Sequence, residues 1–213
     1  MHRLFVGLEL PDRIKGHLIA LMGGLEGVRW QTEDQLHLTL RFIGEVDRAK
    51  AEDIRSALGL VSGEPFDVKL EGVGYFGPDR SPRLLWAGVA DPAPLKHLHE
   101  KLDQALTRVG IAPESRKFKP HVTLARFRRP AAATARLPLF LERSACLSLP
   151  AFTVTRFVLF ESHLLGEGAC YDAVESYPLG LSLDPEDIER FGEWGEVAGP
   201  EGFDMEQDRI GLI

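Results

Sequence analysis

The feature of this sequence that most constrains its fold is a short motif that occurs twice. His37-Leu38-Thr39-Leu40 recurs as His121-Val122-Thr123-Leu124, 84 positions further along the chain. In a β-strand, residues i and i+2 point to the same face. Each motif therefore presents a histidine and a threonine together and turns its aliphatic residues toward a core. The repeat indicates two similar lobes related by an approximate duplication.

The residues around the motifs predict alternating helices and strands. Apolar residues that alternate between turn residues indicate strands, and spacings of three and four indicate helices. Strands are expected at residues 3–10, 28–31, 35–44, 66–76, 84–89, 121–127, 152–160 and 170–177, and helices at 11–22, 47–60, 91–109 and 131–145. Because short loops join several of these strands, we expect an α+β fold with mostly antiparallel sheets and helices outside them.

Charge divides the chain into two parts. Residues 181–213 carry ten acids and two bases, a net charge of −8, so the total of −7 leaves +1 for residues 1–180. A nearly neutral body with local basic clusters is able to bind a phosphodiester. We therefore expect one domain over residues 1–183 and an acidic, loosely ordered extension over 184–213. This extension either aids solubility or occupies the basic site as a phosphate mimic.

Composition also predicts where the protein acts. No apolar run approaches the roughly 18 residues of a membrane span. The first ten residues are too short and too acidic for a signal peptide, and two cysteines make neither a disulfide framework nor a zinc site. We expect a cytoplasmic protein that does not bind membranes and is a monomer.

Two histidines and two threonines on neighbouring strands suit the cleavage of a phosphodiester. Breaking a P–O bond with water needs a base for the nucleophile and an acid for the leaving oxygen, and histidine does either near neutral pH. The hydroxyls of Thr39 and Thr123 can donate hydrogen bonds to phosphate oxygens, where negative charge builds up. This chemistry requires no metal and no other cofactor.

Other side chains near the motifs are candidate substrate contacts. Arg41, Lys119 and Arg126 are cations of the kind expected near an anion. Arg126 shares a face with the histidine of its strand only if that strand twists or bulges after Leu124. Two aromatic residues are candidates for stacking on a nucleobase, Trp30 and Phe42, although Phe42 also suits a core position, as do Trp86 and Phe127.

Three longer stretches carry a family resemblance. The segments RLFVGLELP, VRWQTEDQLHLTLRFIGEV and KFKPHVTLARF make the sequence similar to the two-histidine phosphoesterases. Within these it resembles the RNA 2′,3′-cyclic phosphodiesterases, also called 2′-5′ RNA ligases, over nearly all of residues 1–180. The resemblance implies a bilobal fold with two pseudo-symmetric lobes and a cleft between them. The acidic extension departs from the family pattern.

The resemblance also implies roles for individual residues. The activity would be hydrolysis of an RNA 2′,3′-cyclic phosphate end to a 2′-phosphate. His37 would be the proton donor to the leaving 3′ oxygen, and His121 the proton acceptor that activates water. Thr39 and Thr123 would hold the phosphate, and Arg126 matches an arginine that follows the second motif in many such sequences.

Several alternatives remain open at this stage. Ligation would run the same chemistry in reverse, with an RNA 5′-hydroxyl as the nucleophile. The substrate is expected to be RNA with a cyclic phosphate end, such as a tRNA fragment, but small cyclic nucleotides or non-catalytic binding of RNA ends use the same groups. A metal site at His97 and His99 is disfavoured, because residues two apart on a helix point to different faces.

Overall fold

A computed structural model of the protein describes residues 1–129, 135–165 and 168–180. They belong to one compact unit, Met1–Gly180. The expected acidic extension, residues 184–213, lies outside the described residues, as does the start of the helix expected at 131–145. Within the described part, no helix is long and apolar enough to cross a membrane.

The first half of the chain follows the expected order of elements. The helix after the first strand begins just after Pro11, and the side chain of Asp47 caps the next helix by accepting a hydrogen bond from Lys50 N at 2.8 Å. The expected strand 66–76 is two strands, interrupted at Lys69. The elements are β1 His2–Glu9, α1 Asp12–Leu21, β2 Val28–Trp30, the 3-10 helix η1 Glu33–Gln35, β3 His37–Val46, α2 Arg48–Gly59, β4 Phe66–Val68 and β5 Leu70–Phe76.

The second half repeats this order. A shift of 84 residues carries β3 onto β7, α2 onto α5 and β5 onto β9, and it carries β1 and α1 close to β6 and α3. The expected helix at 131–145 is shorter, and Pro138 lies in its first turn, where proline is tolerated. The elements are β6 Leu84–Val89, α3 Ala93–Arg108, β7 Val122–Phe127, α5 Leu137–Ser144, β8 Phe152–Val154, β9 Arg156–Leu165 and β10 Gly168–Pro178.

The two halves exchange strands. The main sheet has the order β10-β9-β1-β3-β7-β6-β5, with β2 also paired to β7, and β4 pairs with β8 separately. Strand β5 of the first half thus lies beside β6, and β9 of the second half lies beside β1. All pairings between the described strands are antiparallel. The predicted fold class is confirmed, but the lobes share one sheet instead of each having its own.

The lobes meet at equivalent residues of the two halves. Leu38 pairs with Val122 where β3 meets β7, and Val68 pairs with Phe152 where β4 meets β8. Both pairs join positions that are 84 apart, so they lie on the pseudo-twofold axis that relates the halves. Leu38 and Val122 are completely buried. The core is therefore continuous across the junction between the lobes.

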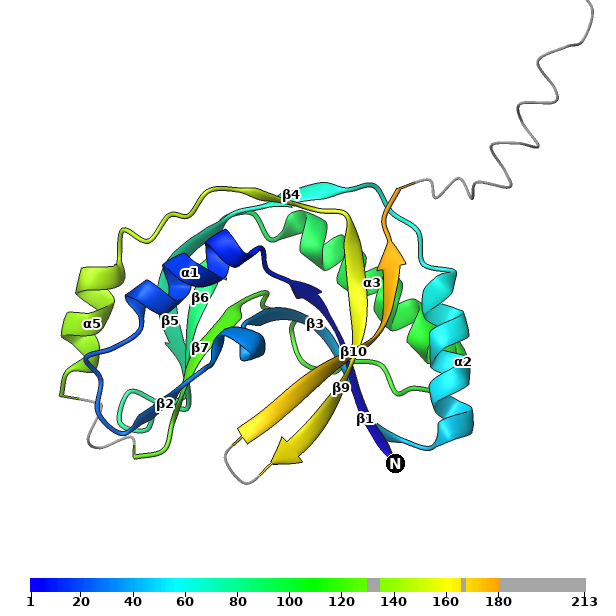
Figure 1. The fold of residues 1–213 in the computed structure, drawn as a ribbon, viewed down its shortest axis with the longest axis horizontal. Coiled ribbons are helices and arrows are strands. Elements are labelled where there is room, and N and C mark those ends of the chain that lie inside the picture. Colours follow the sequence, from blue (N-terminus) through cyan, green and yellow to red (C-terminus); the bar gives the residue numbers. More distant parts are fainter. Residues whose placement is uncertain (130–134, 166–167, 181–213) are drawn as a thin grey trace, which may run out of the picture. The chain divides into compact units, whose positions relative to one another are not determined.

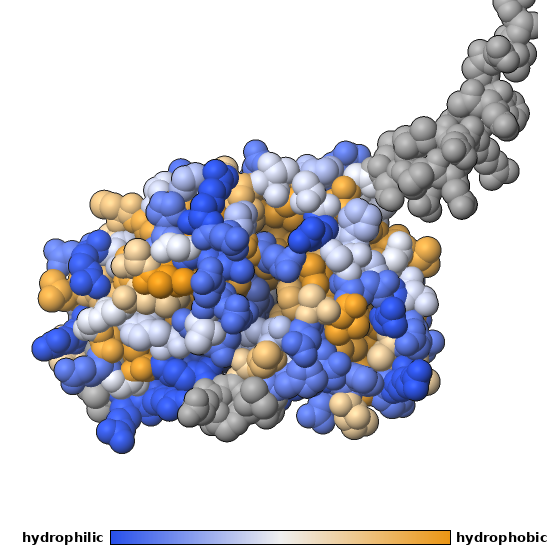
Figure 2. All heavy atoms as spheres, in the orientation of Figure 1, coloured by the Kyte–Doolittle hydropathy of each residue, from blue (hydrophilic) through white to orange (hydrophobic). Residues whose placement is uncertain are grey.

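Helices cover each lobe. Helices α2 and α3 pack together and lie toward β1 and β3, whereas α1 and α5 lie toward β5 and β6 (Figure 1). Their buried residues follow helical spacing, as in α3 with Leu95, Leu98, Leu102 and Leu106. Hydrophobic residues form separate patches among hydrophilic ones on the face shown in Figure 2.

Candidate active site

The two motifs lie side by side at the junction of the lobes. In an antiparallel pair centred on Leu38 and Val122, His37 lies across from Thr123, and Thr39 lies across from His121. The residues between them, Leu38, Leu40, Val122 and Leu124, are at most 1% exposed, because they point into the core. The strand argument thus holds for both motifs, and their four polar side chains share one face of the sheet.

Both imidazole rings are held by the same backbone hydrogen bond. His37 Nδ1 lies 2.9 Å from Gln35 O, and His121 Nδ1 lies 2.7 Å from Lys119 O. A carbonyl oxygen only accepts, so each Nδ1 carries the hydrogen and donates it. Each Nε2 is then free to exchange a proton. His37 Nε2 lies 3.0 Å from Thr39 Oγ1, so the hydroxyl of the motif is within reach of the reacting nitrogen.

The carbonyl that orients His37 is itself fixed by the turn before β3. Thr32 and Gln35 form a capping box around η1, in which the Gln35 side chain accepts a hydrogen bond from Thr32 N. The Gln35 amide also donates to Ala169 O of β10 at 2.7 Å. The turn therefore holds the carbonyl in place for the ring of His37.

Matching register shifts follow the two motifs. Along β7, Thr123 pairs with Trp86 and Ala125 with Leu85, which leaves Leu124 as an extra residue. The same shift occurs in β3, where Leu40 is the extra residue between the pairs of Thr39 and Arg41. An extra residue reverses the alternation of the strand.

As a result, Arg126 is exposed on the histidine face, whereas Ala125 is buried. This is the geometry that the sequence required for Arg126 to reach the site. The shift in β3 has the opposite consequence for Arg41, which is buried beneath the sheet and donates to Asp103 Oδ1 at 2.7 Å. Its proposed place beside the anion is therefore wrong, and it joins β3 to α3 instead.

Aromatic rings surround both histidines. The His37 ring centroid lies 5.0 Å from that of Phe5 and 4.9 Å from that of Tyr171, which meets it edge-on. His121 meets Phe76 edge-on at 5.0 Å. Phe76 and Tyr171 come from strands remote in sequence and were not identified from the sequence. These rings line the surroundings of the two imidazoles.

Trp86 forms the floor beside the second motif. It lies opposite Gly74 in the neighbouring strand, and a Cβ on that glycine would be 2.4 Å from the indole ring. The indole thus needs a glycine there to lie flat on the sheet. Its centroid is 6.5 Å from that of His121. Trp86 is half-buried on the histidine face and is not part of the main core. The core position that the sequence suggested for it is therefore wrong.

Burial and positive charge favour the neutral form of both histidines in the free protein. Burial lowers the pKa of His37 to about 4, and the charges of Arg126 and His121 act in the same direction, against the backbone hydrogen bond to Gln35. Burial and then Arg126 also lower the pKa of His121. The same guanidinium lowers the pKa of both rings, so Arg126 places positive charge near an anion held between them.

The remaining candidate contacts fall in different places. Phe42 is 54% exposed on the histidine face, so the core interpretation of it is wrong. Lys119 is exposed, with Nζ 5.8 Å from the centroid of the Phe76 ring. Trp30 pairs with buried Ala125 and packs on Phe140 at 5.8 Å, which places it on the core face. Its position does not support the predicted contact with a base.

Metal ligands do not gather in the described part of the chain. No group of three or more His, Cys, Asp or Glu side chains there is placed to hold an ion. His97 is exposed, whereas His99 stacks on Phe118 at 4.2 Å and contacts Leu40 O through Nδ1 at 2.9 Å. His99 thus packs between α3 and β3.

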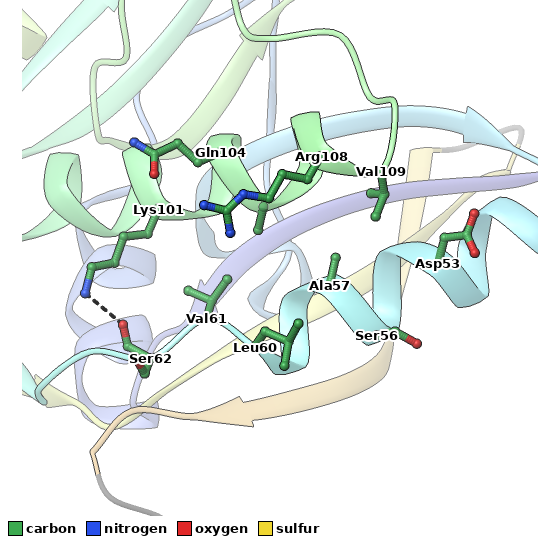
Figure 3. Close-up of a pocket in the computed structure, with 11 residues that line it drawn as sticks. Asp53, Ser56, Ala57, Leu60, Val61, Ser62, Lys101, Gln104, Arg108 and Val109 are labelled. Carbon is green, nitrogen blue, oxygen red and sulfur yellow. Dashed lines mark hydrogen bonds between the residues drawn. The ribbon is translucent and has the colours of Figure 1, made fainter.

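A cavity of about 450 Å³ lies elsewhere, between α2 and α3 (Figure 3). It is lined by apolar residues such as Leu60 and Val61 and by the cations Lys101 and Arg108. Lys101 Nζ donates to Ser62 O at 2.9 Å across it. It contains no residue of either motif, so it is separate from the candidate active site.

Comparison with known proteins gives consistent matches. A family model described as the 2′-5′ RNA ligase superfamily matches residues 12–164. A protein named RNA 2′,3′-cyclic phosphodiesterase from Archaeoglobus fulgidus is 31% identical over 172 residues, which are 79% of this chain and 96% of that protein. Its namesake from Aquifex aeolicus is 30% identical over 190 residues, 84% of this chain and 97% of that protein.

Solved structures agree with the sequence matches. The crystal structure of LigT from E. coli complexed with 3′-AMP is similar to this chain with a TM-score of 0.68 and 28% sequence identity. The similarity covers 84% of this chain and 99% of that one.

Proposed function

This chain belongs to the 2′-5′ RNA ligase superfamily, and we propose that it is an RNA 2′,3′-cyclic phosphodiesterase, which hydrolyses the cyclic phosphate at an RNA end to a 2′-phosphate. The observation that carries this proposal is the shared face of the two motifs. There, each histidine has Nδ1 bound to a backbone carbonyl and Nε2 available, as acid–base catalysis requires. The identity of the proposed substrate is taken from the names of the relatives.

The motif residues then divide the reaction between them. Nε2 of His121 takes a proton from water as the water oxygen attacks phosphorus. The P–O3′ bond breaks, and Nε2 of His37 gives its proton to O3′, leaving a 2′-phosphate and a 3′-hydroxyl. Thr39, Thr123 and Arg126 stabilise the negative charge on the non-bridging oxygens. No metal ion is needed for these steps.

The role of His37 as donor requires help from the substrate. A group whose pKa is about 4 is almost entirely neutral at pH 7 and has no proton to give. A phosphate anion bound between the rings offsets the charge of Arg126 and favours the protonated imidazole. The donor is therefore charged in the complex, and it is neutral in the free protein.

Direct assay of the reaction tests the proposal. RNA ending in a 2′,3′-cyclic phosphate is incubated with the protein in the presence of EDTA, and the terminal phosphate of the product is located. We expect turnover to a 2′-phosphate. Tight binding of the RNA without turnover would overturn the proposal in favour of an RNA-end binding protein.

Two extra substrates define the scope of the activity. Nucleoside 2′,3′-cyclic phosphates measure activity on small nucleotides. The E. coli LigT structure holds 3′-AMP, so a mononucleotide fits a related site. A second RNA with a 5′-hydroxyl measures 2′-5′ ligation, in which that hydroxyl replaces water as the nucleophile.

The setting of the reaction is part of the same proposal. The protein acts as a monomer in the cytoplasm on RNA with cyclic phosphate ends, tRNA fragments among them. Light scattering at working concentration measures the oligomeric state. Sequencing of cyclic-phosphate RNA that accumulates without the protein identifies the substrates.

A further inference from the structure

The cavity between α2 and α3 is an open apolar site that the proposed reaction does not use. Ala57 of α2 and Ala105 of α3 both line it, and their small side chains leave room between the helices. Leu60 and Val61 add larger apolar groups (Figure 3), and Leu60 is 87% exposed. Such a surface is stabilised when an apolar group covers it and removes it from water.

The charges at this cavity are unbalanced. Lys101 and Arg108 lie on its α3 side (Figure 3), and neither forms an ion pair with a carboxylate of the described residues. Among the described residues that line the cavity, Asp53 is the one acid, and its carboxylate pairs with Lys50 Nζ at 3.2 Å. The cavity therefore favours an occupant that is both apolar and negatively charged.

The described part of the chain ends beside this cavity. The backbone N–H of Gly180 donates to Gly63 O at 2.6 Å, and Gly63 directly follows Ser62, which lines the cavity. A Cβ placed on Gly63 would lie 4.0 Å from Lys101 Nζ. The chain beyond Gly180 therefore starts at the end of the cavity that Ser62 and Lys101 form.

The sequence that follows Gly180 has the composition that the cavity favours. Residues 181–194 contain five acids and one base, which give a net charge of −4. Between the acids stand five large apolar residues, Leu181, Leu183, Ile188, Phe191 and Trp194. A segment with this alternation is able to cover an apolar surface while its carboxylates meet the cations at the rim.

The segment is also long enough to fill the cavity. Along α3 the lining residues run from Lys101 to Val109, about 12 Å at ~1.5 Å per residue. Fourteen residues span about 46 Å when extended and about 21 Å as a helix. Residues 181–194 therefore reach the far end of the cavity in either form.

We propose that residues 181–194 dock in the cavity between α2 and α3, with apolar side chains against Leu60 and Val61 and acids beside Lys101 and Arg108. The covalent link through Gly180 gives the segment a high effective concentration at the cavity, so weak contacts are sufficient. Because the cavity contains no residue of either motif, the docked segment leaves the candidate active site open. The inference is independent of the proposed function.

Methyl NMR of the full chain tests this contact. Aromatic rings shift the resonances of methyl groups that they contact, so the double substitution Phe191→Leu and Trp194→Leu removes such shifts. We expect the methyl resonances of Leu60 and Val61 to move on this substitution. Those of Leu139, which is 68% exposed on α5, should stay in place. Phe203→Leu, which removes a ring outside the proposed segment, should move none of these resonances.

Reversal of the two cations tests the role of charge. Lys101→Glu with Arg108→Glu should lower the docking equilibrium constant about tenfold, because two attractive pairs become repulsive. The displacement of the Leu60 and Val61 resonances by the aromatic substitutions should shrink accordingly. Lys69→Glu with Lys96→Glu, at exposed positions outside the cavity, makes the same change in net charge and should leave the displacement as it was. Thermal unfolding of each variant checks that the fold is intact.

Three results would overturn the proposal. The first is that the Leu60 and Val61 resonances do not move when the two rings are removed, as would be found if residues 181–194 occupied the active site or only aided solubility. The second is a displacement that disappears on tenfold dilution, which would assign the contact to a second copy of the chain. The third is a displacement that is undiminished when Lys101 and Arg108 are reversed.

Discussion

At the scale of single residues, the chemistry depends on how the surroundings of His37 control its proton. Burial and the neighbouring guanidinium of Arg126 hold its pKa at about 4 in the free protein. The same residue must donate a proton in the proposed reaction. The environment of His37 is thus suited to binding an anion. The bound phosphate of the substrate raises the pKa of His37, and the imidazole then carries the proton that it donates.

This leads to a difference between two pH profiles. The profile of kcat/KM reports groups of the free enzyme, and that of kcat reports groups of the complex. Because the bound phosphate raises the pKa of His37, we expect the alkaline limb of kcat to lie at higher pH than that of kcat/KM. Steady-state assays over pH 4–9 measure both. Coincident alkaline limbs would contradict the idea that substrate charges the donor.

The lowered pKa of His37 also makes folding sensitive to pH. Between its unfolded pKa of about 6.5 and its folded pKa of about 4, only the unfolded chain binds the proton, so stability is lost as pH falls through this window. The loss is up to ~3 kcal/mol at 1.36 kcal/mol per pKa unit. His37→Asn should make urea unfolding less sensitive to pH between 7 and 4.5. His97→Asn, at an exposed position, should leave the pH dependence of stability as it is in the unaltered protein. An equal pH dependence in the unaltered protein and in both variants would show that His37 is not its cause.

At the scale of elements, the sequence predicted most helices and strands but not the register between strands. Pro11 and Asp47 correctly predicted where the first two α-helices begin, and His37 and Thr39 lie on one face of their strand, as predicted. The extra residues Leu40 and Leu124 are ordinary apolar residues, so nothing in the local pattern signals a register shift. That is why Arg41 was expected at the site, and why Phe42 was interpreted both as a base contact and as a core residue.

Packing between strands gives a prediction at the same scale. A Cβ at Gly74 would lie 2.4 Å from the Trp86 indole, so Gly74→Ala should destabilise the protein by about 1–3 kcal/mol. Adding Trp86→Leu should relieve the clash, making the double variant less destabilised than the sum of the singles. Gly16→Ala in α1, where a Cβ meets nothing within 4 Å, should instead stabilise by about 0.5–1 kcal/mol. Urea unfolding measures the free energy of unfolding of each variant. A double variant that is destabilised by the full sum of the two single substitutions would contradict the predicted clash.

At the scale of the whole molecule, the two halves form a single folding unit because they exchange strands. Strand β5 completes the sheet beside β6, and β9 completes it beside β1. The repeat predicted two similar lobes, but exchange depends on pairings between distant segments, which local patterns do not reveal. The same non-local pairings bring Tyr171 and Phe76 to the histidines, and for that reason neither was found from the sequence.

A core substitution at the junction should therefore affect both lobes at once. Leu38→Ala removes a completely buried side chain and should lower the free energy of unfolding by about 2–5 kcal/mol. Calorimetry should still show one transition, at a lower temperature. Two separate transitions would mean that the lobes fold independently, contrary to the exchanged sheet.

The most direct test of a shared two-histidine site is a cycle of substitutions at His37 and His121. Turnover of RNA ending in a 2′,3′-cyclic phosphate is measured for the unaltered protein, each alanine variant and the double variant, with His97→Ala as the control. We expect each single substitution to reduce kcat by about 10²–10⁴. The double substitution should cost little more, because the two groups act in one step. Full activity in either single variant, or losses that multiply in the double, would contradict a site in which both histidines serve the same reaction.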